Sequence, residues 1–325
     1  MSEQFRVLVT RRIAPEALAM LREQCAVTHW DSSEPIPRDR LLVDVANAEG
    51  LLALLTERVD AELLDAAPQL KIVANMAVGY DNIDVAAATE RGVLVTNTPG
   101  VLTETSAEFA FVLILAAARR LKEAMRWVER GQWTTWDPLL LLGRDLEGAT
   151  LGLVGYGRIA AAVARRAHGI GMRLVYHSRN AHAEDEARYA MQRLTFDDLL
   201  RTSDVVSLHV PFTTATRHLI SHRQLHLMKP TAFLVNTSRG GVLDQQALYT
   251  ALTTGSIAGA ALDVTEPEPL SAEHPLVQLD NCLVVPHIAS ASVATRTRMA
   301  TLAAENIIAV LRGEPALTPV RSASG

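Results

Sequence analysis

The sequence predicts an α/β protein made of two doubly wound lobes, each a parallel sheet covered by helices. Short β-branched runs alternate with helical patterns along most of the chain, which is typical of right-handed βαβ units. The 325 residues exceed what one hydrophobic core usually organises, so two domains are expected. The alternation breaks at Thr98-Pro99-Gly100 and resumes at Thr150, so we expect the second lobe to begin near Gly100.

The first lobe is predicted from five apolar runs that are short enough to be strands. These runs are Phe5–Thr10, Ala26–Trp30, Leu51–Leu55, Lys71–Met76 and Val93–Thr98. Helical patterns lie between them. Pro15–Gln24 has a proline suited to a first turn, and Asp84–Arg91 is closed by Gly92. The lobe therefore has the alternation that a parallel sheet needs.

The second lobe begins with one long apolar helix, predicted from Leu102 to Leu121, and an irregular stretch from Gly131 to Gly143. Six strands follow: Leu151–Val154, Leu174–His177, Val205–Val210, Phe233–Thr237, Ala258–Val264 and Leu283–Val285. Six strands in a βα series are what a full dinucleotide-binding domain requires. We expect the last helix, Ser292–Leu311, to return to the first lobe. The predicted domains are residues 1–99 with 290–325, and residues 100–289.

Composition excludes several classes of protein. Hydrophobic residues make up 49% and charged residues 21% of the chain, which is ordinary for a globular protein. The net charge of −5 gives no basic surface for nucleic acid or an anionic membrane, and the apolar run Ala107–Ala118 is too short to span a bilayer. Only Cys25 and Cys282 occur, without metal-ligand spacing, so we expect a cytoplasmic protein with no metal site.

A glycine-rich segment after the strand Leu151–Val154 predicts a phosphate-binding loop. It carries the G-x-G-x-x-A pattern at Gly155, Gly157 and Ala160. Gly155 permits the tight turn, Gly157 lets the backbone approach a pyrophosphate, and Ala160 lets the helix pack on the strand. A plain glycine turn is the alternative, but the preceding strand and the helix that starts at Arg158 favour a dinucleotide site.

The tip of the next strand indicates which dinucleotide is bound. NAD sites usually carry an acidic residue there, which accepts hydrogen bonds from the ribose hydroxyls. Here the strand ends in Ser178 and Arg179. A hydroxyl and a guanidinium suit a 2′-phosphate, which a carboxylate would repel. We predict NADPH, with NADH as the weaker cofactor; the alternative is that Arg179 is only a solvated loop residue.

Reactive side chains follow three late strands. Arg239 comes after the fourth strand of the second series, and His287 follows the last; between them the loop Asp263–Pro269 holds Asp263, Glu266 and Glu268. Ligands bind beyond the carboxyl ends of parallel strands, so these groups could meet. Imidazole is a natural proton donor, a carboxylate could orient it, and a guanidinium could hold a substrate carboxylate. Structural roles are the alternative for each residue alone.

Several motifs together resemble the D-isomer-specific 2-hydroxyacid dehydrogenase family, most of all its glyoxylate/hydroxypyruvate reductases. They are Val78–Asp84, Asn97–Thr105, Gly155–Ile159, Asn236–Gly240, Ala261–Val264 and Pro286–Ile288. The resemblance covers nearly the whole chain; Ala160 departs from the family's usual glycine. It implies a flavodoxin-like substrate-binding domain and a Rossmann cofactor domain, with the substrate between them.

The resemblance also implies roles for individual residues. Arg239 would bind substrate and His287 would be the acid/base, with Glu268 as its partner because a leucine follows Glu268-Pro269. The backbone amides of Val78 and Gly79 would hold the substrate carboxylate. Asp263 would face the nicotinamide carboxamide. The implied cofactor contacts are Thr105, Gly155, Gly157, Arg158, Ile159, Ser178, Arg179, Pro211, Thr237 and Asp263.

The function implied is NADPH-dependent reduction of glyoxylate and hydroxypyruvate to D-2-hydroxy acids. A 2-ketogluconate reductase would share every residue named, and an NAD(H)-sensing corepressor is a further alternative. The resemblance also implies a homodimer formed through the cofactor domain. The segment Trp136–Gly143 resembles the extension by which these reductases reach toward the partner subunit. Its four leucines, Leu139–Leu142, suit either an interface or packing on their own lobe.

Overall fold

The computed structural model describes residues 4–320. The chain forms two compact units: residues up to Leu102 together with those from Ala291 on, and Thr103–Ser290. The first unit is therefore discontinuous, and its divisions at 102/103 and 290/291 lie beside the predicted ones at 99/100 and 289/290. No helix within residues 4–320 is long and apolar enough to cross a membrane.

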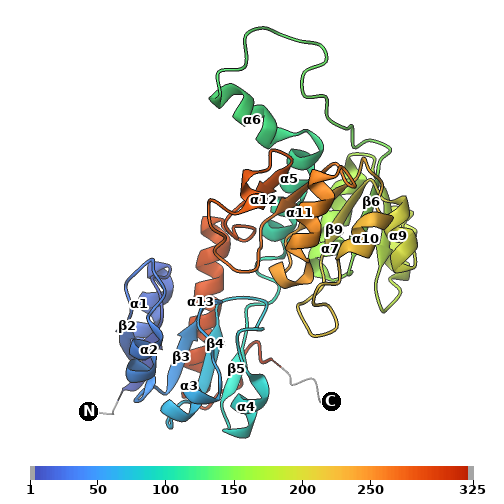
Figure 1. Ribbon diagram of the computed structural model, residues 1–325. Coiled ribbons are helices and arrows are strands. Elements are labelled where there is room, and N and C mark those ends of the chain that lie inside the picture. The colour runs from blue at the N-terminus through green and yellow to red at the C-terminus, as the bar shows by residue number, and fades with distance from the viewer. Residues whose placement is uncertain (1–3, 321–325) are drawn as a thin grey trace. The chain divides into compact units, whose positions relative to one another are not determined.

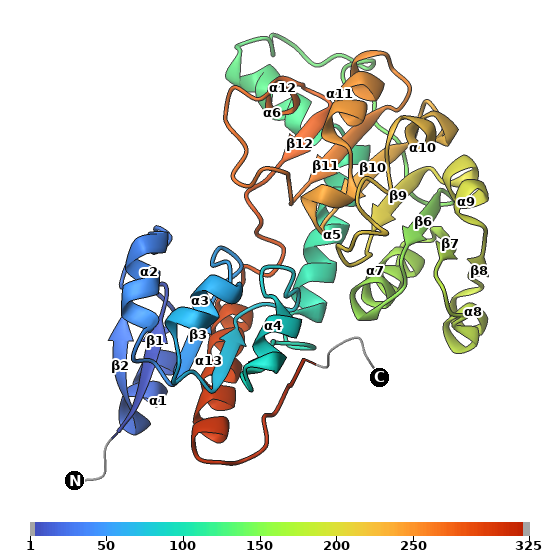
Figure 2. The ribbon, with the colours of Figure 1, turned by 60° about the horizontal axis from the view of Figure 1, so that its bottom comes forward.

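The first unit contains a five-stranded parallel sheet. Its strands are β1 (Phe5–Val9), β2 (Cys25–His29), β3 (Gly50–Ala53), β4 (Ile72–Asn75) and β5 (Leu94–Thr96). They lie in the order β2-β1-β3-β4-β5, and every pairing is parallel (Figure 2). This is the order of flavodoxin-like doubly wound sheets. Each strand overlaps a predicted run, and the predicted fold class is confirmed.

Helices cover both faces of this sheet. One face packs on α2 (Arg38–Val45), α3 (Ala61–Ala66) and α4 (Val85–Glu90), whose buried residues share one core with the strands. The side chains of Asp60 and Asp84 cap α3 and α4 by accepting from backbone amides. On the other face, α1 (Pro15–Gln24) packs on α13 (Val293–Leu311), and a Cβ at Gly50 would lie 3.0 Å from the Ile307 side chain.

The second unit contains a seven-stranded parallel sheet in the order β12-β11-β10-β9-β6-β7-β8 (Figure 2). Its strands are β6 (Thr150–Val154), β7 (Arg173–His177), β8 (Gln192–Arg193), β9 (Val205–Leu208), β10 (Phe233–Asn236), β11 (Gly259–Leu262) and β12 (Cys282–Val284). All six predicted strands are present in a Rossmann order. The prediction missed β8, because two exposed polar residues carry no hydrophobic pattern.

Two helical layers enclose this sheet. One face packs on α5 (Thr103–Ala118) and α7 (Arg158–Gly169). The other packs on α9 (Phe196–Thr202), α10 (His222–Leu227), α11 (Gln245–Thr253) and α12 (Pro275–Gln278). The unit also contains α8 (Ala183–Tyr189) and the short 3-10 helix η1 (Gly240–Val242). The sheet is thus buried on both sides, and only its edges and strand ends are open to ligands.

The helix predicted over Leu102–Leu121 is present as α5, but it ends three residues earlier, at Ala118, and the prediction missed a second helix after it. The chain forms α5, turns at Arg120, and continues as α6 (Leu121–Glu129). Arg120 has φ 52° and ψ 39°, a left-handed conformation that no helix continues through. After this turn the Nζ of Lys122 donates to the carbonyls of Val277, Leu279 and Cys282, at 2.8, 2.7 and 2.6 Å. Those distant partners are invisible to a local hydrophobic pattern.

Candidate active site

The glycine loop after β6 has the geometry of a phosphate cradle. Gly155 has φ +84°, and a Cβ there would lie 2.7 Å from the carbonyl oxygen of His209, so only glycine fits. A Cβ at Gly157 would meet no atom within 4 Å, which leaves open space beside the backbone. Gly157 is the N-cap residue of α7 and has no side chain that could accept a hydrogen bond from the helix. The first amides of the helix, including those of Arg158 and Ile159, are therefore available to bind a phosphate.

A turn at the end of β7 holds the two residues predicted to choose the cofactor. Ser178 is half-buried and Arg179 is exposed. Arg193 of β8 donates to the carbonyl oxygens of Ser178 at 2.9 Å and of Arg179 at 2.8 Å. This guanidinium fixes the turn and adds a second positive charge beside Arg179. Sequence reasoning missed Arg193, because its role depends on two backbone carbonyls that precede it by 14 and 15 residues.

Two carboxylates lie soon after this turn, on α8, but tyrosines already bind them. Asp185 accepts from the Tyr156 hydroxyl at 2.9 Å, and Glu186 accepts from the Tyr176 hydroxyl. Tyr176 is fully buried, so these bonds fasten α8 to the sheet. Neither carboxylate takes the place that an NAD site usually gives to an acidic residue at the strand tip.

Three other predicted cofactor residues lie in loops or helix starts of the same unit. The Oγ1 of Thr237, just after β10, is buried and has no hydrogen-bond partner within residues 4–320. A bound polar group would satisfy it. Pro211 lies beyond β9, and its carbonyl accepts from Thr216. Thr105 is half-buried in the first turn of α5, next to Glu104, which forms an ion pair with Arg166 of α7.

Asp263, at the end of β11, holds the loop that carries the histidine. It is 1% exposed, and its carboxylate accepts from the amides of Ile288 at 2.7 Å and Ala289 at 2.9 Å. Burial raises the pKa of the Asp263 carboxyl, while these two amides and the nearby His287 oppose that rise. The sequence predicted a nicotinamide contact for Asp263; the structure adds this anchoring of the His287 loop.

The sequence spacing did not decide whether Glu266 or Glu268 is the partner of His287; in the structure, His287 lies against Glu268. Its Nδ1 is 2.5 Å from Oε1 of Glu268. Glu266 instead forms an ion pair with Arg217 at 3.0 Å. His287 has φ 52°, a left-handed backbone that is rare for a residue with a side chain, and its amide donates to the Asp263 carbonyl. The loop therefore fixes both the backbone and the ring of His287.

Arg239 lies in the neighbouring loop, between β10 and η1. Asn236 donates to its carbonyl at 2.9 Å, which closes the turn. A Cβ at Gly240 would lie 2.0 Å from the carbonyl oxygen of Thr265, so the Arg239 loop runs directly against the loop that leads to Glu268. Because β10, β11 and β12 are adjacent and parallel, Arg239, Glu268 and His287 lie at the same edge of the sheet.

The two residues predicted to bind the substrate carboxylate lie in the first unit, after β4. Val78 and Gly79 are half-exposed. Their carbonyls accept from the side chains of Asn97 and Asn75, each at 2.8 Å. Within residues 4–320 neither amide N–H has a hydrogen-bond partner. Sequence reasoning missed both asparagines, although Asn97 begins a motif that it had singled out and Asn75 lies in a predicted strand.

Within residues 4–320 no group of three or more His, Cys, Asp or Glu side chains could hold a metal ion. Cys25 and Cys282 are both buried and free. The residues present instead offer a proton donor, an orienting carboxylate, a guanidinium and a dinucleotide cradle.

Comparison with known proteins agrees with this arrangement. Residues 111–289 match the family model of the D-isomer specific 2-hydroxyacid dehydrogenase NAD binding domain. A glyoxylate reductase from Korarchaeum cryptofilum is 52% identical over 310 residues, which are 95% of this chain and 93% of the relative. Another, from Aeropyrum pernix, is 51% identical over 313 residues, with the same 95% and 93% covered.

Solved structures of similar proteins share the whole fold. A protein from Thermus thermophilus is 46% identical, covers 98% of this chain and 100% of its own, and has a TM-score of 0.91. The NADPH-dependent glyoxylate/hydroxypyruvate reductase from Sinorhizobium meliloti, solved with NADP and malonate, is 35% identical with a TM-score of 0.84. It covers 98% of this chain and 97% of its own.

Proposed function

The chain belongs to the D-isomer specific 2-hydroxyacid dehydrogenase family, and we propose that it uses NADPH to reduce glyoxylate and hydroxypyruvate to D-2-hydroxy acids. The observation that carries this proposal is the 2.5 Å contact between His287 and Glu268, in the loops that follow β12 and β11. The loop that holds Glu268 runs against the Arg239 loop. The names of the similar proteins, glyoxylate reductase and glyoxylate/hydroxypyruvate reductase, support the choice of substrate.

Each residue has a task that its chemistry suits. NADPH, when bound, supplies the hydride that reduces the carbonyl carbon. His287 donates the proton to the carbonyl oxygen, and Glu268 keeps its ring oriented for that transfer. Arg239 binds the substrate carboxylate and polarises the carbonyl with its planar fork of donors. The amides of Val78 and Gly79 hold the carboxylate as well.

The residues at the end of β7 support a preference for NADPH over NADH. Ser178 and Arg179 offer a hydroxyl and a guanidinium, and Arg193 adds a second guanidinium that is bound to the turn itself. The acidic residues that follow, Asp185 and Glu186, accept from tyrosines. A 2′-phosphate would therefore meet two positive charges at this turn, which supports NADPH.

A panel of 2-keto acids with both cofactors tests the proposal. We expect glyoxylate and hydroxypyruvate to be reduced with NADPH at kcat/KM above about 10⁴ M⁻¹s⁻¹, which is the lower end for natural enzymes. The measurement is the loss of NADPH absorbance, with 2-ketogluconate as a third substrate. Faster turnover of 2-ketogluconate would replace the assigned substrate, and no turnover of any 2-keto acid would overturn the proposed reaction.

We also propose that two copies associate through the second unit, on the evidence of its exposed apolar surface. The cationic side chains of α6 bind it to the rest of the second unit. Arg126 forms an ion pair with Asp280 at 2.6 Å, and Lys122 donates to the nearby carbonyl of Cys282. The apolar face of α6 points outward instead, with Met125 56% and Val128 57% exposed. An amphipathic helix normally buries that face, so a second copy of the chain is its natural cover.

The segment after α6 extends this exposed surface. Figure 1 shows it as a long green loop that leaves the sheet of its own unit. Trp136 is 80% exposed and Leu139 is 73% exposed, which favours an interface over packing on their own lobe. A pocket of about 500 Å³, lined in part by Leu121, Leu142 and Phe233, opens beside α6 at the amino ends of β10 and β11. A hydrophobic arm from a second copy would fit such a pocket.

Charged substitutions on this surface test the association. Met125→Glu and Leu139→Glu should each weaken a homodimer by about 100-fold or more, because a buried unpaired carboxylate is costly. Sedimentation velocity across a concentration series measures the change. Val43→Glu is the matched control, since Val43 is an exposed apolar residue (69%) on α2 of the other unit. A wild-type chain that sediments as a monomer at micromolar concentration would refute the dimer.

A further inference from the structure

Three successive carbonyl groups in the loop after β4 are each held by a donor. The carbonyl of Ala77 accepts from the amide of Thr98 at 2.8 Å. The carbonyl of Val78 accepts from the side-chain amide of Asn97, and that of Gly79 from the side-chain amide of Asn75. A loop seldom has every carbonyl fixed in this way, so the direction of each peptide group is determined.

Fixing a carbonyl also fixes the next N–H. In a trans peptide the C=O and N–H are coplanar and point in opposite directions. The bond from Thr98 therefore aims the Val78 amide, the bond from Asn97 aims the Gly79 amide, and the bond from Asn75 aims the Tyr80 amide. Within residues 4–320 none of these three amides has a partner. Successive unpaired N–H groups in a turn are the elements from which proteins build anion-binding concavities.

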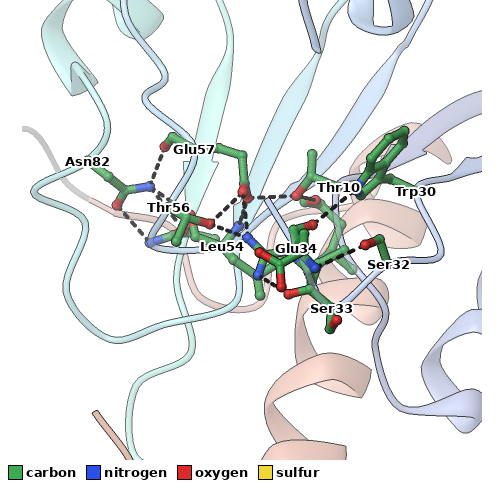
Figure 3. A network of polar contacts seen from close by, with 12 residues as sticks. Thr10, Trp30, Ser32, Ser33, Glu34, Leu54, Thr56, Glu57 and Asn82 are labelled. Atoms are coloured by element: carbon green, nitrogen blue, oxygen red, sulfur yellow. Dashed lines mark hydrogen bonds and ion pairs between the residues drawn. The ribbon is translucent and has the colours of Figure 1, made fainter. Parts of the chain in front are cut away.

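The two asparagines are themselves held in place. Asn75 is fully buried, and its side chain lies 3.4 Å from that of Asn82. Asn82 in turn donates to the carbonyls of Leu54 and Glu57, each at 2.9 Å (Figure 3). The carbonyl of Asn97 accepts from the Thr318 hydroxyl at 2.6 Å. The Asn75 side chain is thus held by a second side chain, and the Asn97 backbone by Thr318.

Figure 3 shows how the same network continues around Glu57. The carboxylate of Glu57 is buried and accepts from the Thr10 hydroxyl and the Leu54 amide, each at 2.7 Å. The loops after β1, β3 and β4 are thereby joined by hydrogen bonds at one edge of the sheet. This rigidity gives the asparagines a firm base from which to hold the loop.

We propose that Asn97 and Asn75 are positioning residues, which preorganise the amides of Gly79 and Tyr80 to bind the substrate carboxylate. The proposal rests on the proposed function, because it takes the ligand to be a 2-keto acid. It adds the Tyr80 amide as a donor and gives the physical reason why the directions of these amides are fixed. Preorganised donors bind an anion without the cost of ordering the loop at the moment of binding.

Substitution of Asn97 separates positioning from stability. Asn97→Ala should raise KM for glyoxylate about 10-fold, and the Kd of oxamate, an unreactive carboxylate analogue, by the same factor, since one lost hydrogen bond is worth about that much. We expect kcat and the Kd of NADPH to stay within about twofold. Steady-state kinetics and calorimetric titration of the intact enzyme give these values. Asn75→Ser, which shortens the second tether, carries the same expectation if Asn97→Ala does not fold.

Asn281→Ala is the matched control. Its side-chain amide also donates to two backbone carbonyls, those of Leu252 and Ala258, but in the second unit. It should lower Tm without changing the Kd of oxamate. An unchanged Kd in the asparagine variants, with wild-type turnover intact, would overturn the positioning role alone. A wild-type enzyme that neither reduces a 2-keto acid nor binds oxamate would overturn the proposed function as well.

Discussion

His287→Ala should lower kcat for glyoxylate by about 10²–10⁴-fold, the range that a positioned general acid contributes. The Kd of NADPH should stay unchanged, because the phosphate cradle at Gly155 and Gly157 lies in a different loop, after β6. Stopped-flow turnover gives kcat, and quenching of protein fluorescence gives the cofactor affinity. Loss of NADPH binding together with activity would mean that His287 shapes the fold and does not transfer the proton.

The two glutamates of the same loop provide the control for this experiment. Glu268→Gln removes the carboxylate that lies 2.5 Å from the imidazole, so it should lower kcat about 10-fold or more. Glu266→Gln makes the same chemical change two residues away, where the carboxylate forms an ion pair with Arg217 instead. Only the first variant should approach the His287→Ala phenotype. Equal losses in both would show that the loop's general charge, and not the contact with His287, matters.

The strands could be predicted because they are buried on both faces. β3, β4, β9, β10 and β11 are buried at every residue, so each appears in the sequence as a mainly apolar run, with Asn75, Ser207 and Asn236 as the polar exceptions. The glycine loop could be predicted because its backbone conformation excludes other residues at Gly155. Both features are local, and local constraints leave a readable pattern.

The break between α5 and α6 could not be predicted, since the apolar pattern runs on past it. Leu121, Met125 and Val128 have helical spacing, and that spacing normally marks a buried face. In the structure this face is exposed, and Lys122 faces the lobe. The sequence analysis predicted no helix over Leu121–Glu129, and a local pattern does not tell whether an apolar helix face meets the same chain or another one.

Part of the candidate site depended on contacts between residues far apart in the chain. Spacing alone left Glu266 and Glu268 equivalent, and the choice between them rested on resemblance until the fold placed His287 beside Glu268. The bonds from Asn75 and Asn97 to the loop after β4 have no periodicity at all. Single hydrogen bonds of this kind become visible only once the fold has placed donor and acceptor together.

Arg179→Asp should lower the preference for NADPH over NADH by about 10²–10⁴-fold. The substitution removes a charge-assisted hydrogen bond to the 2′-phosphate and adds repulsion, and each effect is worth about 1.5–3 kcal/mol. It also supplies the acidic group that NAD sites usually carry at this strand tip. The measurement is the ratio of kcat/KM for the two cofactors at one fixed glyoxylate concentration.

The ratio is the right quantity because the two cofactors differ only in the 2′-phosphate. Any loss of folding, lobe movement or proton transfer affects both and cancels. Arg188→Asp is the matched control: it makes the same charge change at an exposed position on α8, where the guanidinium lies over the Tyr189 ring. If that variant shifts the ratio as far as Arg179→Asp, the general field of the lobe sets the preference. If neither shifts it, the turn at Ser178 and Arg179 does not bind the phosphate, and the assignment of NADPH falls.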